Sequence, residues 1–505
     1  MKFWKEKLTP FALSNLFCLL FVSFTLLKIP AESVLVADNQ TKILQAQAFL
    51  DTGFRSQYSN CSVLEGLGGC AYSLGGNGKN IPILIGVFPV AFSLFAALVR
   101  LTGNYTHLVY VSVLLFFAGN SLISFRIRKD FWIPAVLTFG PCFFHSFLFP
   151  DYAIIYFLVA GLVSFYYKPN SGIYSSFVIG LLTGIGVFFR PEVVFLPFFL
   201  GASLIFHFFK KGFPGKNTDD AKRFSLLIGY GFAVFLFFLM NYLLYGNFLG
   251  TRIEANKTGM ESFLDWGKYA SLLFYGNGRV GFFLFSSWVL VALSYLLFRF
   301  RGLDRKEKEL LCATIMSIFL ILLLSPNDSN IDWGTRYLSW LLIPVAVLYF
   351  AKDFEKTTLD KIWRKSVISF FALGLIVVYV FFRLQAKVSQ EFQKYNSVLT
   401  NLSGEVSVLS EPSIIGFYGK DILEKKVLLI RRSEDKKEFV KFLSGRVSRL
   451  DLIQYEPVTY YLLEEMRQDK LERNETILKR ELLQQGWRLS DQRIASKLEI
   501  LSFVR

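Results

Sequence analysis

The sequence predicts a polytopic α-helical membrane protein, with about 11–12 transmembrane helices, followed by a small C-terminal α/β domain. Apolar residues make up 53% of the 505 residues, and the mean hydropathy is +0.42. Apolar runs approaching the roughly 20 residues that a transmembrane helix needs recur from residue 11 to residue 384. The remaining residues lack such runs and resemble ordinary soluble protein.

The expected transmembrane helices follow the apolar runs. The first run, at about 11–30, follows a basic start and has no small-residue cleavage site after it, so we interpret it as a signal anchor. The other runs lie at approximately 81–101, 107–125, 131–149, 152–167, 173–189, 193–209, 224–245, 281–299, 309–325, 337–351 and 366–384.

The net charge of +16 indicates membrane orientation and not nucleic-acid binding, because the basic residues lie in short loops between apolar runs. The basic loops all become cytoplasmic if the N-terminus is cytoplasmic and segment 81–101 does not cross. Its Pro82, Pro89 and Arg100 suit a re-entrant or interfacial helix. Eleven spans result, with the loop 31–106 and the C-terminal domain on the outer side.

The five cysteines fit this arrangement. Cys18, Cys142 and Cys312 lie in apolar runs, where free thiols behave as small hydrophobic groups. Cys61 and Cys70 share a glycine-rich outer loop, where an oxidising periplasm would let them form a disulfide. Two unpaired thiols are the alternative.

Two carboxylates near membrane level need an explanation, because inserting an ionisable residue costs about 2.5–3.5 kcal/mol. Asp38 follows the first apolar run, at the start of an expected amphipathic helix, and Asp151 lies in the turn Phe149-Pro150-Asp151-Tyr152. Both have a plain structural alternative, since an acidic side chain at a helix N-terminus caps free backbone N–H groups.

Two arginines lie at the same expected face. Arg190 can simply neutralise Glu192, and Arg336 can simply extend to the polar interface, as arginines at helix ends often do. Together, however, two carboxylates and two arginines at one membrane face suit an anionic lipid phosphate and a hydroxyl that must be deprotonated.

Several short motifs accompany these residues in order. Asp38 is followed by Ala46 or Ala48, Leu50 and Gly53. The later segments are Phe88-Pro89-Val90 running on to Gly103, Gly180-Leu181-Leu182-Thr183-Gly184 leading to Arg190-Pro191-Glu192, Tyr245-Gly246-Asn247-Phe248-Leu249-Gly250 and Gly334-Thr335-Arg336-Tyr337-Leu338. In order and sidedness, over roughly residues 1–350, the chain resembles the GT-C superfold of polyprenyl-phosphate-dependent glycosyltransferases. That superfold includes the protein mannosyltransferases and lipid A aminoarabinose transferases of glycosyltransferase family 39 type.

The resemblance implies an enzyme of the bacterial inner membrane. It would transfer a sugar from a polyprenyl-phosphate donor to a periplasmic acceptor, which could be a glycan, lipid or protein, by a single inverting displacement. Asp38 would be the general base and Asp151 would position acceptor or sugar, while Arg336, Arg190 and Lys42 would bind the donor phosphate. The implied partners are this donor, the acceptor and membrane lipids, without nucleic acid.

The chain also departs from the family pattern. Many relatives have a second acidic residue where this chain has Asn39, which weakens a metal-dependent mechanism. The histidines, His107, His145 and His207, lack the spacing of metal ligands, so no metal site and no cofactor are predicted, although a divalent ion stays possible. A transporter or flippase for a lipid-linked glycan and a catalytically inactive relative remain alternatives; we find no internal repeat of the kind that transporters usually show.

The predicted domains are a transmembrane domain at 1–389 and a soluble periplasmic α/β domain at 390–505. In the second domain, residues 405–410, 426–430 and 498–504 are expected as strands, and residues 434–443 and 475–485 as helices. This domain shows no catalytic constellation, and binding of the acceptor or simple stabilisation are its two expected roles.

The predicted orientation is testable by cysteine labelling. In a background where the native cysteines are replaced by serine, Asp130→Cys and Lys216→Cys should react only from the cytoplasm. Asn60→Cys and Met260→Cys should react from the periplasm with an impermeant maleimide. Labelling of positions 60 and 216 from the same side would contradict the orientation.

Overall fold

The computed structural model describes residues 2–35, 38–54, 59–60, 83–84, 90–127, 131–169, 172–212, 218–250, 265–276, 279–325, 336–351, 357–409, 412–423, 427–429, 436–456 and 474–505. The chain forms two compact units. Unit 1 comprises Met1–Lys28, Pro89–Phe92 and Leu108–Gln385, and unit 2 comprises Ile29–Phe88, Ser93–His107 and Ala386–Arg505. Most of the segment that follows the first helix therefore clusters with the C-terminal residues and not with the helical bundle.

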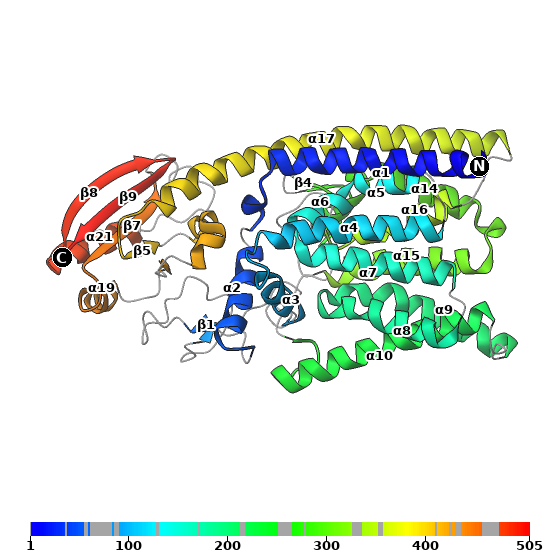
Figure 1. Cartoon of the computed structure of the whole chain (residues 1–505), viewed down its shortest axis with the longest axis horizontal. Coiled ribbons are helices and arrows are strands. Elements are labelled where there is room, and N and C mark those ends of the chain that lie inside the picture. Colours follow the sequence, from blue (N-terminus) through cyan, green and yellow to red (C-terminus); the bar gives the residue numbers. More distant parts are fainter. Residues whose placement is uncertain are drawn as a thin grey trace. The chain divides into compact units, whose positions relative to one another are not determined.

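Unit 1 is a helical bundle whose main helices run roughly alongside one another (Figure 1). Its helices are α1 (Lys2–Lys28), α4 (His107–Arg126), α5 (Trp132–Thr138), α6 (Pro141–Leu148), α7 (Pro150–Tyr167), α8 (Ile173–Gly184), α9 (Phe195–Lys211), α10 (Asp219–Tyr245), α12 (Trp266–Leu273), α13 (Phe282–Phe285), α14 (Ser287–Phe298), α15 (Arg305–Leu324), α16 (Leu342–Phe350) and the first part of α17 (Thr358–Thr400). Short 3₁₀ helices are η2 (Ile185–Phe188), η3 (Pro191–Val194), η5 (Phe300–Gly302) and η6 (Ser339–Leu341), and Tyr275–Gly276 (β3) pairs with Arg279–Val280 (β4).

Among the described residues, five helices are long and apolar enough to cross a membrane. They correspond to α4, α7, α9 with η3, α10 and α17, and five further apolar helices have 10–17 residues. The helical, apolar character predicted from the sequence is confirmed, whereas the count of eleven spans stays a prediction.

Two of the expected continuous spans are broken. The run 131–149 divides into α5 and α6 at Gly140, which has an extended backbone, and Pro141 occupies the first turn of α6, where a missing N–H costs nothing. The run 281–299 divides at Ser286 into α13 and α14. The residues of α5 and α6 around the first break are almost all buried in protein, which is where a membrane protein tolerates an interrupted helix.

The centre of unit 1 is formed by α7 and α16. Every residue of α16 is buried, and α7 is buried over most of its surface. A helix that is apolar on all sides belongs in the interior of a bundle, and α7 therefore connects the two ends of unit 1 through its core.

Glycines allow α8 and α10 to approach closely. A Cβ atom at Gly180 would lie 1.9 Å from the carbonyl oxygen of Leu226, and one at Gly229 would lie 2.1 Å from that of Phe177. A Cβ at Gly184 would lie 2.5 Å from the Cβ of Ala233. Small residues at a helix interface bring backbones together in this way in membrane proteins, where packing drives association.

Unit 2 contains η1 (Ala31–Val34), α2 (Asp38–Asp51), most of α3 (Val90–Arg100), the end of α17 and a five-stranded mixed sheet. The short strands β1 (Ser59–Asn60) and β2 (Ile83–Leu84) pair antiparallel. The C-terminal elements are β5 (Val406–Leu409), α18 (Pro412–Ile415), η7 (Gly416–Leu423), β6 (Val427–Leu429), α19 (Lys436–Ser444), β7 (Arg449–Tyr455), α21 (Asn474–Gln484), β8 (Arg488–Ala495) and β9 (Leu498–Val504). With 11 residues, α3 is too short to cross a membrane as a simple helix.

The sheet has the strand order β6-β5-β7-β9-β8 (Figure 1). β6, β5 and β7 are parallel, and β9 and β8 are antiparallel additions. Alternate side chains of the strands enter two cores: one contains residues of α19 and α21, and the other contains residues of α17, α18 and η7. The five strands and helices predicted near the C-terminus are all present in this sheet region, and the structure adds β7, β8, α18 and η7.

The close packing of α8 and α10 predicts a strong response to one methyl group. Gly180→Ala should destabilise unit 1 by about 1–3 kcal/mol, because the new Cβ would overlap a backbone carbonyl that cannot rotate away. Gly231→Ala is the matched control on α10, since nothing lies within 4 Å of its Cβ position and alanine favours a helix. Thermal unfolding in detergent compares the two; equal midpoints would contradict the packing argument.

Candidate functional site

Asp151 lies in the first turn of α7, directly after Pro150. The side chain is 3% exposed, and its Oδ2 lies 3.1 Å from Nε of Arg190. The favourable field of a helix N-terminus also acts on a carboxylate here. Asp151 is therefore more than an exposed helix cap: it is half of a buried ion pair between two segments 39 residues apart.

Arg190 joins Asp151 to Glu192. It lies between η2 and η3 and is 1% exposed, and its Nη1 donates to Oε1 of Glu192 at 3.2 Å. Burial alone lowers the pKa of Arg190, but the charges of Asp151 and Glu192 outweigh it, and the pKa lies above its ordinary value. Arg190 is held ionised by two carboxylates, which is how a buried charge becomes tolerable.

Arg336 belongs to the same neighbourhood of unit 1. Its guanidinium carbon lies 5.2 Å from the ring centroid of Phe149 and 5.7 Å from that of Tyr337. The positive charge of Arg336 repels that of Arg190, and Arg336 is 7% exposed. The structure thus brings together Asp151, Arg190 and Arg336, with both arginines in a poorly solvated setting where their charge acts strongly on an anion.

The segment after Arg336 is anchored by α6. His145 Nδ1 lies 2.7 Å from Oγ of Ser339, and Sγ of Cys142 lies 3.1 Å from the Ser339 carbonyl oxygen. His145 and Ser339 are both fully buried. These side chains fix the start of η6, three residues beyond Arg336. The sequence alone assigns His145 no role in this contact, because nothing in it relates His145 to a serine 194 residues away.

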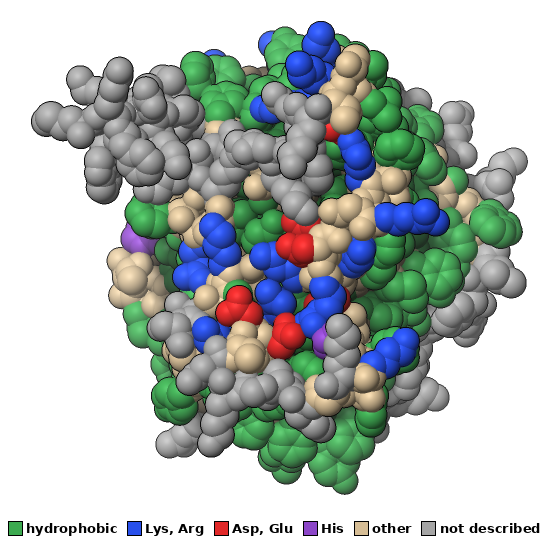
Figure 2. Space-filling model, turned by 90° about the vertical axis from the view of Figure 1, so that its right-hand side faces the viewer, with side chains coloured by type: hydrophobic (Ala, Val, Ile, Leu, Met, Phe, Trp, Pro, Cys, Tyr) green, Lys and Arg blue, Asp and Glu red, His purple; other side chains and the backbone are tan. Residues whose placement is uncertain are grey.

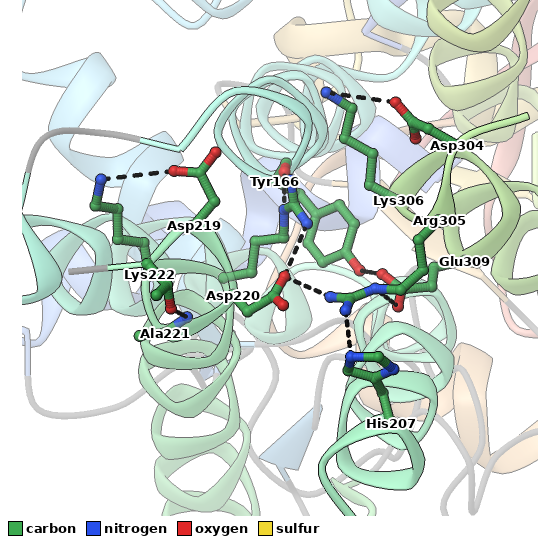
Figure 3. Close-up of polar contacts among 12 residues, drawn as sticks. Tyr166, His207, Asp219, Asp220, Ala221, Lys222, Asp304, Arg305, Lys306 and Glu309 are labelled. Atoms are coloured by element: carbon green, nitrogen blue, oxygen red, sulfur yellow. Dashed lines mark hydrogen bonds and ion pairs between the residues drawn. The ribbon is translucent and has the colours of Figure 1, made fainter. Parts of the chain in front are cut away.

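A second polar cluster occupies the opposite end of α7. Figure 2 shows this end of unit 1, where Lys and Arg side chains gather with Asp and Glu in the middle of a face rimmed by hydrophobic side chains. Arg305 is its centre: it contacts Asp220 and His207, and its Nε lies 3.0 Å from Glu309 (Figure 3). Tyr166 donates to Glu309 at 2.7 Å.

This second cluster joins four helices at one level. Arg223 Nε donates to the Tyr166 carbonyl at 3.0 Å, which links α10 to the end of α7. Asp304 and Glu307 form a reciprocal capping box at the start of α15, with contacts of 3.0 and 2.8 Å. Because opposite charges pair here between neighbouring helices, we interpret this cluster as a structural one that holds the helix ends together.

Asp38 and Lys42 lie in unit 2, not in unit 1. Asp38 is the first residue of α2, and Lys42 follows it by about one turn. The Lys42 side chain is 2% exposed. Asn39, Gln40 and Gln45 of the same helix are also buried, so α2 places an unusual number of polar side chains inside unit 2.

No protein-family model matches the chain, and a search among curated proteins finds no match. The glycosyltransferase resemblance therefore rests on the sequence motifs.

Metal ligands and the predicted disulfide complete the site description. Among the residues that the structure describes, no group of three or more His, Cys, Asp or Glu side chains could hold a metal ion. Cys61 and Cys70 lie outside the described residues, so their pairing stays a prediction. Among the described cysteines, Cys18 and Cys142 are buried thiols and Cys312 is an exposed thiol, none of them in a disulfide.

The ion pair of Asp151 and Arg190 predicts a large stability effect. Arg190→Met should cost about 3–5 kcal/mol, because it leaves the Asp151 carboxylate buried without its cation. The double variant Asp151→Leu/Arg190→Met should recover much of that loss, since the Asp151 carboxylate is then no longer left buried without its cation.

The matched control is Lys222→Met. It removes an ion pair with Asp219, whose side chain is 64% exposed, and should cost less than about 1 kcal/mol. Unfolding in detergent, followed by circular dichroism, measures all three variants. A loss in Arg190→Met no greater than in Lys222→Met would show that the pair has little energetic weight.

Proposed function

We propose that this chain is a membrane glycosyltransferase that transfers a sugar from a polyprenyl-phosphate donor to an acceptor hydroxyl on the periplasmic side of a bacterial inner membrane. The observation that carries the proposal is the buried group of Arg190 and Arg336 with Asp151 at one end of the bundle. Two guanidiniums at the end of a set of apolar helices suit a lipid whose tail lies in the membrane and whose phosphate lies at its surface.

The direction of α1 supports a role for Asp38 at this same end. Cys18 contacts the carbonyl of Pro134 in α5, and Phe21 contacts Phe143 in α6, so α1 runs in the direction of α5 and α6, toward Pro150. Asp38 follows Lys28, the last residue of α1, by ten residues, which span at most about 35 Å when extended. In sequence, Asp38 is therefore separated by only this short segment from the end of α1 that runs toward Pro150.

The proposed reaction is one inverting displacement. Asp38 takes the proton of the acceptor hydroxyl as its oxygen attacks the anomeric carbon, and the bond from that carbon to the phosphate oxygen breaks. Polyprenyl phosphate leaves with the bonding electron pair. Arg336 and Arg190 stabilise the charge that develops on it, as preorganised donors do most effectively where water is excluded.

The geometry refines two of the predicted roles. Arg190 already holds the Asp151 carboxylate, so proton transfer by Asp151 would break a buried ion pair. We therefore assign Asp151 the orientation of Arg190, in addition to any contact with sugar or acceptor. Arg336, on the aromatic ring of Phe149, is the better ligand for the incoming phosphate. Lys42, buried in unit 2, stays a predicted phosphate ligand.

The two ends of unit 1 support the proposed orientation. The second cluster, at the ends of α7, α9, α10 and α15, contains the basic residues Arg223, Arg305 and Lys306. Figure 2 shows Lys and Arg side chains gathered on this face. Basic residues concentrate on the cytoplasmic side of membrane proteins. The Asp151 end would then face the periplasm, together with the C-terminal domain.

Asp38→Asn should abolish transfer in protein that is still folded and inserted. Asparagine keeps the size of the side chain and caps a helix about as well as aspartate, but it cannot accept the acceptor proton. Activity should fall by about 10²–10⁴-fold, the usual contribution of a general base. The measurement is release of polyprenyl phosphate from a polyprenyl-phosphate sugar by the purified protein in lipid nanodiscs.

Arg336→Ala is the contrasting variant and should weaken binding of the donor lipid first. Normal turnover by Asp38→Asn would remove Asp38 from the mechanism. A wild-type protein that moves a lipid-linked glycan across liposome membranes without cleaving it would favour a flippase. A wild-type protein that binds the donor lipid but neither cleaves nor moves it would favour an inactive relative.

A further inference from the structure

Gln40 ties α2 to the C-terminal part of the chain within unit 2. It follows Asp38 by two residues and is fully buried. Its Nε2 donates to the carbonyl oxygens of Ile415 at 3.0 Å and of Gly419 at 2.9 Å. An amide nitrogen carries two hydrogens, so both can be directed to carbonyl groups some 375 residues away in sequence.

The segment η7, whose Gly419 carbonyl accepts a hydrogen bond from Gln40, has a backbone conformation that depends on glycine. Gly419 has φ +53° and ψ −130°, a conformation that residues with a Cβ rarely adopt. A Cβ at this position would also lie 2.9 Å from the ring of Phe392 in α17. The carbonyl that receives Gln40 is therefore presented by a specifically shaped turn.

A second amide, which is partly buried, also holds η7. Asn396, near the end of α17, donates from Nδ2 to the carbonyls of Phe417 at 3.1 Å and Tyr418 at 3.2 Å. It also lies 3.0 Å from the carboxylate of Asp421. The turn is thus fixed between α17 and α2 by the same kind of contact on each side.

The segment before α2 is fastened to the same region. Asn39 donates to the Val34 carbonyl at 2.8 Å, which links α2 to the end of η1. Lys420 of η7 pairs with Glu32 at 3.1 Å, and Ser389 of α17 donates to Ser33 at 2.7 Å. Leu44, one turn beyond Gln40, packs against the core on one face of the sheet. Residues that precede α2 and residues that follow its first turn therefore both contact the C-terminal part of unit 2.

We propose that Gln40 and Asn396 are positioning residues: through η7, they hold the first turn of α2 in the place that the reaction requires of Asp38. This rests on the proposed function of Asp38 as general base. Burying apolar surface alone would dock α2, but buried amides cost free energy unless their directional hydrogen bonds are made, and those bonds fix one geometry. The C-terminal domain then serves catalysis by orienting the segment that bears the base, without contributing a reacting group.

The expected effect falls on turnover. A general base must lie within hydrogen-bond reach of the acceptor hydroxyl, and displacement by about 1 Å can cost about 10²-fold in rate. In Gln40→Met, which keeps the length of the side chain and removes its donors, kcat should fall about 10- to 100-fold. The KM for the polyprenyl-phosphate sugar should change less than kcat, because Arg336 and Arg190 are untouched and, of the predicted phosphate ligands, Lys42 alone lies on α2.

Hydrogen exchange gives a readout that does not depend on activity. In full-length protein in nanodiscs, the backbone amides of residues 38–44 should exchange faster in Gln40→Met than in the wild type. Asn396→Ala should give the same local exchange and the same loss of kcat, although it changes no residue of α2. Gln47→Met is the control on α2: Gln47 contacts only Tyr105 and Asp51 in the described contacts, and wild-type exchange at 38–44 and wild-type kcat are expected.

The outcomes separate this inference from the proposed function. If Asp38→Asn abolishes transfer while Gln40→Met and Asn396→Ala keep wild-type kcat and exchange, the positioning role is overturned and the base is not. If the wild type releases no polyprenyl phosphate, the proposed function fails, and exchange at residues 38–44 still decides whether Gln40 holds α2. Should Gln40→Met not fold, Gln40→Asn, which is one methylene too short, replaces it, with unchanged exchange counting against the inference.

Discussion

An arginine buried to 1% exposure cannot remain in an apolar bundle without carboxylates beside it, and much of unit 1 follows from this requirement. Arg190 brings the turn between η2 and η3 onto the first turn of α7, because Asp151 lies there. At the other end of α7, the buried Arg223 imposes the same requirement, which Asp220 meets. The more exposed Arg305 pairs there with Asp220 and Glu309. Between these two levels α7 is apolar and buried. The polar groups therefore set where the apolar interior begins and ends, and packing fills the space between.

The sequence predicts those parts of the fold that depend on local pattern. Long apolar runs predict helices such as α4 and α10, and short β-branched runs predict β5, β6 and β9, all of which the structure contains. β8, with the sequence Arg-Leu-Ser-Asp-Gln-Arg-Ile-Ala, was not predicted, because as an exposed edge strand it has no apolar face to reveal its period. β7 was missed although it is almost fully buried; Asp451 interrupts its apolar pattern and is satisfied only by the distant Gly404 and Ser502. The break at Gly140 is not predicted, because the long apolar run 131–149 favours one continuous helix. Gly140 and Pro141, two adjacent helix-breaking residues, outweigh that tendency in the structure.

The candidate site shows the same division. Asp151, Arg190 and Arg336 stand out in sequence because charges near membrane level are costly, and the structure places all three in one neighbourhood. Their pairing could not be predicted, since segments tens to hundreds of residues apart must first be brought together by the fold. His145 with Ser339, and Gln40 with Gly419, carry no local signal at all: each is an ordinary polar residue whose partner is chosen by tertiary contact. Sequence therefore identifies the groups with unusual charge and misses those that hold them in place.

The unbroken length of helix α17 limits which insertions and deletions the helix can accept. Its 43 residues form one unbroken helix of about 64 Å, and Ser389, Phe392 and Asn396 lie on one stripe of it, at spacings of three and four residues. One residue inserted before this stripe would rotate it by about 100° relative to the preceding part of the helix, whereas seven residues would return it to within about 20°. Insertions or deletions of about two turns therefore keep these side chains on the same face of the helix, whereas most other changes in length move them to another face. The number of residues in the helix therefore determines the direction in which Ser389, Phe392 and Asn396 project around its axis.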